Sequence, residues 1–128
     1  MYRFRQYRNG VTRKSIDAFK HLPKIGTLVE IRGYRVKSHF KTFATNMEYV
    51  LIKGTNGSCR LGGLLWGYQG EGPRGLEALL KHLGFGEDVT RLAFTLKRFN
   101  TPGIDWRITL PYKLEVRQSE EQNLRNSA

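Results

Sequence analysis

Residues 64–76 read L-L-W-G-Y-Q-G-E-G-P-R-G-L, and this stretch decides much of the fold. Its glycines permit a sharp reversal of the backbone, and Pro73 suits the first turn of a helix. Gly84 stands where such a helix would end. The leucines between them recur at helical spacing: Leu76, Leu79, Leu80 and Leu83. The stretch therefore predicts an extended segment, a tight turn and then an amphipathic helix.

The same stretch has some ingredients of an anion site, because a Gly-rich turn precedes a helix N-terminus. It does not match G-x-x-x-x-G-K-[ST], since no Lys-Ser or Lys-Thr follows. The G-x-G-x-x-G spacing is present from Gly70, but Pro73 removes an N–H donor and Glu71 would repel phosphate. We interpret the stretch chiefly as a structural joint, with exposed Tyr68, Gln69 or Arg74 as the binding alternative. The structural motif consists of Trp66, Gly67, Tyr68, Gly70, Gly72 and Pro73.

The chain before this stretch is predicted to form strands and one short helix. In the opening Y-R-F-R, Tyr2 and Phe4 fall on one side of an extended chain, and Arg3 and Arg5 fall on the other. Spacing and turn signals give the other elements: a helix over 13–22, a strand from residue 27 with a bulge at Gly33, and a hairpin of 48–53 with 59–65. Residues 38–46 form either a loop or a continuing strand.

After the leucine-rich helix, the pattern predicts a brief helical turn, a strand over 93–99, a turn at 100–103 and a last strand over 105–110. This order indicates an α+β fold, with a small, mostly antiparallel sheet, one main amphipathic helix packed on it and a short N-terminal helix. We expect residues 1–116 to form a single domain and residues 117–128 to form a polar, flexible tail.

Charge is the strongest global signal. The chain carries 22 Lys and Arg against 11 Asp and Glu, a net charge of +11. Residues 1–41 hold half of the basic residues and only two acids, Asp17 and Glu30. Clustered cations gain affinity for polyanions by releasing counterions from phosphates, so this basic third predicts nucleic-acid binding. The alternative is a charge that only keeps the protein in solution.

Aromatic residues are interleaved with these cations, as on surfaces that stack bases and contact phosphates. The same rings could instead be buried, with only the arginines facing solvent. The predicted phosphate contacts are Arg3, Arg5, Arg8, Arg13, Lys14, Arg32, Arg35, Lys37 and Lys41. The predicted stacking residues are Tyr2, Tyr7, Phe40 and Phe43.

Residues for catalysis are sparse. The three histidines are scattered, and Cys59 is the one cysteine, so we expect no metal site, no cofactor and no disulfide. Cys59 beside Arg60 is either a thiolate nucleophile or, as we interpret it, a small structural residue. No apolar run approaches the ~20 residues that cross a bilayer. We expect a cytoplasmic protein that is not an enzyme; a nuclease or other hydrolase is the least supported alternative.

The segment W-G-Y-Q-G-E-G-P-R-G-L at 66–76 resembles the signature W-G-Y-x-G-x-G-P-x-x-L of a family of small, uncharacterised bacterial, plasmid and phage proteins. The likeness extends over about residues 47–116. The resemblance implies a strand, a Gly-rich turn and a leucine-rich helix, but no activity. Gly75 and Glu77 depart from the small or apolar residues common there, and the basic residues 1–41 lack a counterpart.

The sequence thus supports a small basic accessory protein that binds single-stranded or structured RNA or DNA through backbone contacts and aromatic stacking. The resemblance suggests a place in a mobile-element or phage-related nucleoprotein system. The alternative function is a non-enzymatic subunit or regulator that binds a protein partner in a larger nucleoprotein complex.

Overall fold

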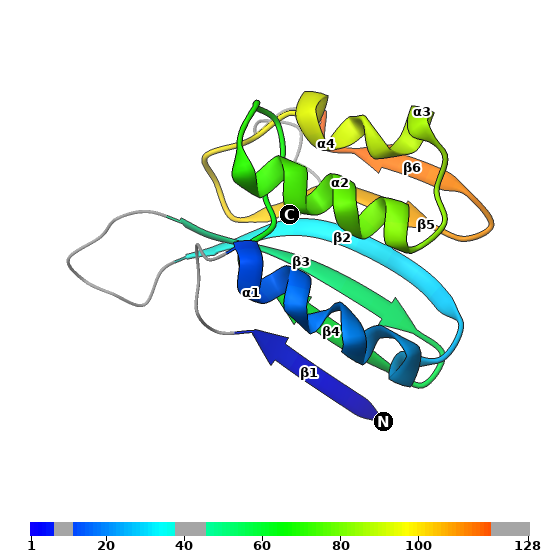
Figure 1. Ribbon diagram of the computed structural model, residues 1–128. Coiled ribbons are helices and arrows are strands. Elements are labelled where there is room, and N and C mark those ends of the chain that lie inside the picture. The colour runs from blue at the N-terminus through cyan, green and yellow to red at the C-terminus, as the bar shows by residue number, and fades with distance from the viewer. Residues whose placement is uncertain (7–11, 38–45, 119–128) are drawn as a thin grey trace.

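The computed structural model describes residues 1–6, 12–37 and 46–118, which form a six-stranded sheet with helices packed on one face (Figure 1). The strands are β1 (Tyr2–Gln6), β2 (Leu28–Lys37), β3 (Asn46–Gly54), β4 (Gly57–Leu61), β5 (Gly103–Thr109) and β6 (Lys113–Val116). They lie in the order β1-β4-β3-β2-β5-β6. β1 runs parallel to β4, and the other neighbouring pairs are antiparallel. The predicted α+β fold with a mostly antiparallel sheet is confirmed.

The helical layer supplies the other half of the core. It consists of α1 (Thr12–Asp17), the 3₁₀ helix η1 (Ala18–Ile25), α2 (Glu71–His82), α3 (Glu87–Thr90) and α4 (Leu92–Thr95). Leu76, Leu79 and Leu80 of α2 are buried, as their spacing predicts, and Gly84 follows with a φ of 93°. They pack with Ile31 and Ile52 of the sheet in one hydrophobic cluster. None of the helices in the described ranges is long and apolar enough to cross a bilayer.

Three sequence predictions about elements need correction. The helix expected over 13–22 begins as α1 but continues as η1 past Pro23 to Ile25. The strand expected over 93–99 is wrong, because α4 covers Leu92–Thr95; Val89, Ala93 and Leu96 are buried at helical spacing. Strand β6 was not predicted, and it pairs with β5 as a short edge strand. The segment 38–45 lies outside the described residues.

A buried charged cluster joins β2 to β5. Asp105 accepts hydrogen bonds from Nε and Nη2 of Arg35 at 2.9 and 2.7 Å, and from the Trp66 indole at 3.0 Å. Arg35 also contacts Glu48 at 2.8 Å, and the buried Arg117 lies 3.6 Å from Asp105. Arg117 is the first residue of the tail expected over 117–128, and its side chain, 3% exposed, reaches this cluster.

A register shift makes this cluster possible. Gly33 pairs with Trp106 but Tyr34 pairs with Ile104, so Asp105 is the extra residue of a bulge, next to the predicted position Gly33. Asp105 and Trp106 are consequently both buried. A β-carbon at Gly33 would overlap the Trp106 indole, so only glycine lets this ring lie flat over β2.

We expect Arg35→Met to destabilise the fold by about 3 kcal/mol or more, because it leaves a buried carboxylate without its main counter-charge. Urea denaturation followed by circular dichroism measures this loss. Arg32→Met is the matched control on the same strand, and its partly exposed ion pair should contribute about 1 kcal/mol or less. Equal losses in the two variants would contradict a dominant role for the buried pair.

The edge strand β1 is fastened to η1 through His21. The Phe4 ring stacks on the imidazole with 3.9 Å between centroids, and a 2.6 Å hydrogen bond joins the Tyr2 hydroxyl to Nδ1 of His21. Loss of solvation, then the charges of Lys20 and Lys24, lower the pKa of His21 below its usual 6.5.

Acid should therefore weaken the fold. The unfolded chain binds the His21 proton more tightly than the folded protein, so this contribution is complete above pH 6.5 and decreases as pH falls below it. We expect the free energy of unfolding to decrease between about pH 7.5 and about pH 5.5 in denaturant titrations. His21→Gln should reduce this pH dependence; an unchanged pH profile in this variant would contradict the assignment.

Candidate nucleic-acid interface

The sheet face opposite the helices carries basic side chains in register across all six strands. Pairing places one residue from each strand in a first row: Arg5, Arg60, Leu51, Arg32, Arg107 and Glu115. A second row contains Arg3, Ser58, Lys53, Glu30, Thr109 and Lys113. We call this surface the arginine face and define it by Arg3, Arg5, Arg32, Lys53, Arg60 and Arg107.

Period-two alternation on each strand produces this surface. On β1, Tyr2 and Phe4 pack against the hydrophobic cluster while Arg3 and Arg5 are exposed, as the sequence predicted. On β4, Cys59 and Leu61 are buried and Arg60 lies between them on the outer face. Because neighbouring strands are about 4.8 Å apart, side chains of one row lie within reach of a single extended ligand.

Few acidic groups balance these cations. Arg32 contacts Glu30 at 2.6 Å, and Arg107 lies 3.9 Å from the same carboxylate. Like charges stand directly opposite each other twice in the first row, at Arg5 with Arg60 and at Arg32 with Arg107. Such a surface has a strong positive potential, which attracts polyanions.

Two tyrosines lie beside the first row. The Tyr34 and Tyr49 rings are 5.8 Å apart, and the Arg60 guanidinium lies 4.7 Å from the centre of the Tyr49 ring. Tyr49 is buried, whereas Tyr34 is half-buried and presents part of its ring to solvent. Tyr49 thus supports Arg60 and Tyr34, and Tyr34 is the ring that a ligand can reach.

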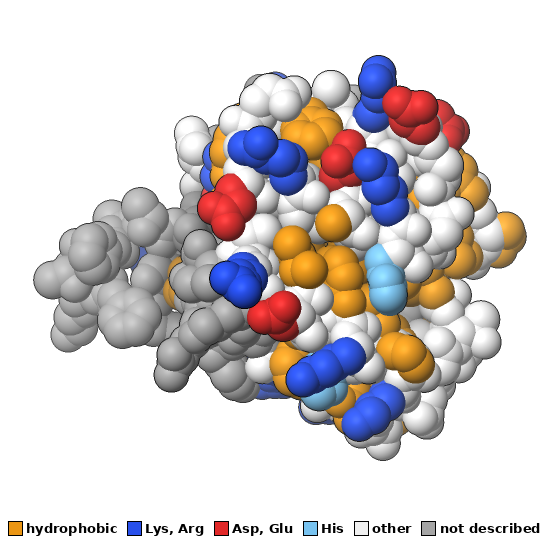
Figure 2. Space-filling view, in the orientation of Figure 1, with side chains coloured by type: hydrophobic (Ala, Val, Ile, Leu, Met, Phe, Trp, Pro, Cys, Tyr) orange, Lys and Arg blue, Asp and Glu red, His pale blue; other side chains and the backbone are white. Residues whose placement is uncertain are grey.

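The helix-covered side differs in charge. Figure 2 shows basic and acidic side chains interspersed there, with apolar atoms between the helices. Its acids lie on α1, α2 and α3: Asp17, Glu71, Glu77, Glu87 and Asp88. Lys81 and Arg91 form ion pairs with two of them. The helical side therefore mixes cations with five acids, whereas the two rows of the opposite face contain two acids, Glu30 and Glu115.

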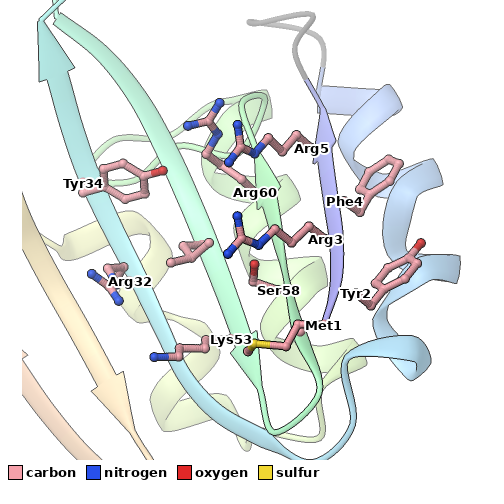
Figure 3. Close-up of a pocket in the computed structure, with 12 residues that line it drawn as sticks. Met1, Tyr2, Arg3, Phe4, Arg5, Arg32, Tyr34, Lys53, Ser58 and Arg60 are labelled. Atoms are coloured by element: carbon pink, nitrogen blue, oxygen red, sulfur yellow. The ribbon is translucent and has the colours of Figure 1, made fainter.

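The arginine face contains a pocket of about 360 Å³ at its β1 end (Figure 3). Five of the six cations line it, together with Tyr34 and Leu51, and no Asp or Glu is among the lining residues. In Figure 3, Arg3 and Arg5 point from β1 across β4, whereas Tyr2 and Phe4 point away toward the helix. The small residues Gly57 and Ser58 leave the hollow between the long side chains.

The structure brings together only some of the predicted contact residues. Arg3, Arg5 and Arg32 share the arginine face, while Arg13 is exposed on α1 and Lys37 is exposed at the end of β2. The other predicted residues lie outside the described ranges or have undescribed side chains: Tyr7, Arg8, Lys14, Phe40, Lys41 and Phe43.

Two predicted contacts are corrected. Arg35 is 5% exposed and holds Asp105, so it belongs to the core rather than to a phosphate-binding surface. Arg35 directly follows Tyr34 on β2, and successive side chains of a strand point to opposite faces of the sheet. Tyr2 faces η1, where its ring lies near His21 and Lys24, so it does not join the outer face.

Four residues of the candidate interface are not among the contacts predicted from the basic residues 1–41. Lys53, Arg60 and Arg107 come from the near-neutral remainder of the chain, and Tyr34 was considered only as part of a strand. Alternation alone could have pointed each outward, as in S-C-R-L and D-W-R-I-T-L. Only strand order and register show that they are neighbours of Arg3 and Arg5.

The Gly-rich motif forms a structural joint. Trp66 is fully buried, meets Trp106 edge-on at 5.8 Å and donates to Asp105. Gly67 has a φ of 88° and packs against the Leu96 carbonyl, a position where a side chain would be strained. Gly72 and Pro73 are buried in the first turn of α2, and Tyr68 is partly exposed with Arg98 over its ring.

Other reactive groups are isolated. No group of three or more His, Cys, Asp or Glu side chains converges within the described ranges to hold a metal ion. Cys59 lies in the core, and burial raises the pKa of its thiol to about 11. The thiol is therefore neutral at physiological pH, which corrects the thiolate alternative and supports the structural interpretation.

Cys59 should react with a disulfide reagent such as Ellman's reagent far more slowly in the folded protein than in denaturant. Burial removes both access and thiolate, so we expect native labelling at neutral pH to be at least about a hundredfold slower. Absorbance of the released thiol follows both reactions. Rapid stoichiometric labelling of the native protein would show that Cys59 is accessible and ionised.

Comparisons with known proteins found no match among protein-family models, curated proteins or solved structures. The function is therefore inferred from the residues and geometry described above.

Proposed function

We propose that the protein is a non-enzymatic nucleic-acid-binding protein that contacts the phosphate backbone with its arginine face. The observation that carries this proposal is the register of the sheet. Pairing places basic residues from β1, β4, β3, β2 and β5 in two adjacent rows, and Glu30 is the one carboxylate that these five strands contribute to the two rows. Guanidinium groups suit phosphate because they offer several donors in a fixed plane.

The shape of the face fits a polymer better than a small anion. The first row crosses all six strands, so its ends are separated by about 24 Å at the usual strand spacing. An extended backbone can contact several cations of the row at once, and each contact releases counterions. Aromatic Tyr34 beside the row adds a surface for bases.

Fluorescence anisotropy with labelled single- and double-stranded RNA and DNA tests the proposal. Affinity should fall steeply between about 50 and about 200 mM salt. The variant Arg3→Gln/Lys53→Gln/Arg107→Gln should lose about tenfold or more in affinity and lower the salt slope by about 2 for single strands, because three phosphate contacts disappear.

A matched variant separates local contacts from net charge. Lys20→Gln/Lys81→Gln/Arg91→Gln removes the same charge from exposed positions in the helical layer and should retain most of the affinity. Equal losses in the two triple variants, or affinity independent of salt, would overturn the proposal. Capture of a protein partner that survives nuclease treatment, without nucleic-acid binding, would favour the alternative of a protein-interaction subunit.

A further inference from the structure

We propose that the pocket at the β1 end of the arginine face holds one unpaired nucleotide, so that the protein prefers single strands to duplexes. This inference rests on the proposed function and specifies its substrate class. The phosphate would lie among the β1 and β4 arginines, and the base would lie against Tyr34 and Leu51.

The dimensions of the pocket suit this ligand. Its volume of about 360 Å³ lies in the range of sites for small organic molecules. Gly57 and Ser58 of β4 are among its lining residues, and Arg3 and Arg5 point across β4 from β1 (Figure 3). A flat cationic surface would bind any phosphate backbone, but this hollow also admits a planar group.

Cations line both sides of the pocket, and uncharged ligand-facing surface lies on one of them. Arg3 and Arg5 on β1 and Arg60 on β4 provide cations at one side, with Arg60 held by the Tyr49 ring. At the other side, Arg32 and Lys53 also line the pocket. Tyr34 on β2 extends its ring toward it in Figure 3, and Leu51 is the uncharged residue between Arg60 and Arg32 in the first row. A nucleotide matches this lining, because its phosphate suits the cations and its aromatic base suits Tyr34 and Leu51.

Base pairing decides which nucleic acid can use both sides. In a duplex the bases are stacked on one another inside the helix, so the arginines can reach phosphates but Tyr34 cannot reach a base face. An unpaired nucleotide can turn its base into the pocket while its phosphate stays on the arginines. The pocket therefore adds affinity for single strands only.

Anisotropy titrations with an RNA of about 12 nucleotides, its DNA counterpart and the matching duplexes test this at one salt concentration. The unmodified protein should bind the single strands about tenfold tighter than the duplexes. Tyr34→Leu should lower single-strand affinity by about fivefold to a hundredfold and leave duplex affinity unchanged, because it removes stacking but no charge. Tyr112→Leu, at an exposed tyrosine that does not line the pocket, should change neither affinity.

Competition on the unmodified protein gives a second measurement that does not depend on a variant folding. Adenosine 5′-monophosphate should displace the single-stranded probe at a lower concentration than inorganic phosphate, because only the nucleotide can fill both sides of the pocket. Equal displacement by the two competitors would overturn the inference.

The two proposals fail differently. Equal affinity for single strands and duplexes, or equal losses for both in Tyr34→Leu, would overturn the nucleotide pocket while salt-dependent binding through the arginine face stands. Absence of binding to every probe, or no effect of the Arg3, Lys53 and Arg107 substitutions, would overturn the proposed function itself.

Discussion

Arg35 and Asp105 form an ion pair inside the core, and a charge removed from water must be compensated where it lies. The negative charge of Asp105 is compensated only while four parts of the chain keep their places. These parts are β2 with Arg35, the turn after β4 with Trp66, the backbone before β5 at Phe99, and Arg117 after β6. A shift in any of them leaves a buried carboxylate short of donors. Hydrophobic packing alone tolerates rearrangement, so this pair makes one arrangement of β2, β5 and α2 preferable to near alternatives.

The arginine face follows from the same constraint. If β2 slipped by one residue against β5, the Arg35–Asp105 contact would be lost and Arg32 would turn toward the core. The bulge at Asp105 lets two consecutive residues be buried and then returns the strand to its alternation, so Arg107 points outward. The internal charges thus fix the register that arranges the external ones.

Much of the fold was accessible from sequence because its signals are local. The alternation in Y-R-F-R, the hairpin around residues 54–58 and the leucine spacing of α2 each predict the structure that is observed. The misassignment of 93–99 shows the limit: short apolar runs suit strand and helix alike until a packing partner decides. The family resemblance of residues 66–76 stays a prediction, because no comparison tests it.

The candidate site was harder to predict because it is made by pairing between distant segments. Arg5 and Arg60 are neighbours through the parallel pairing of an edge strand, which no local pattern specifies. In the sequence, Arg35 looks equivalent to Arg32, because both lie in the same basic segment. Arg35 is internal because it pairs with Asp105, which lies three strands later in the chain. Composition indicated the type of ligand, and the register indicates where it would lie.

The two like-charge pairs in the first row give the arginine face a further consequence. Arginines that oppose each other across neighbouring strands repel, although Glu30 offsets part of the repulsion between Arg32 and Arg107. On the proposed function, a phosphate seated between the arginines would relieve this repulsion, so binding would stabilise the folded protein.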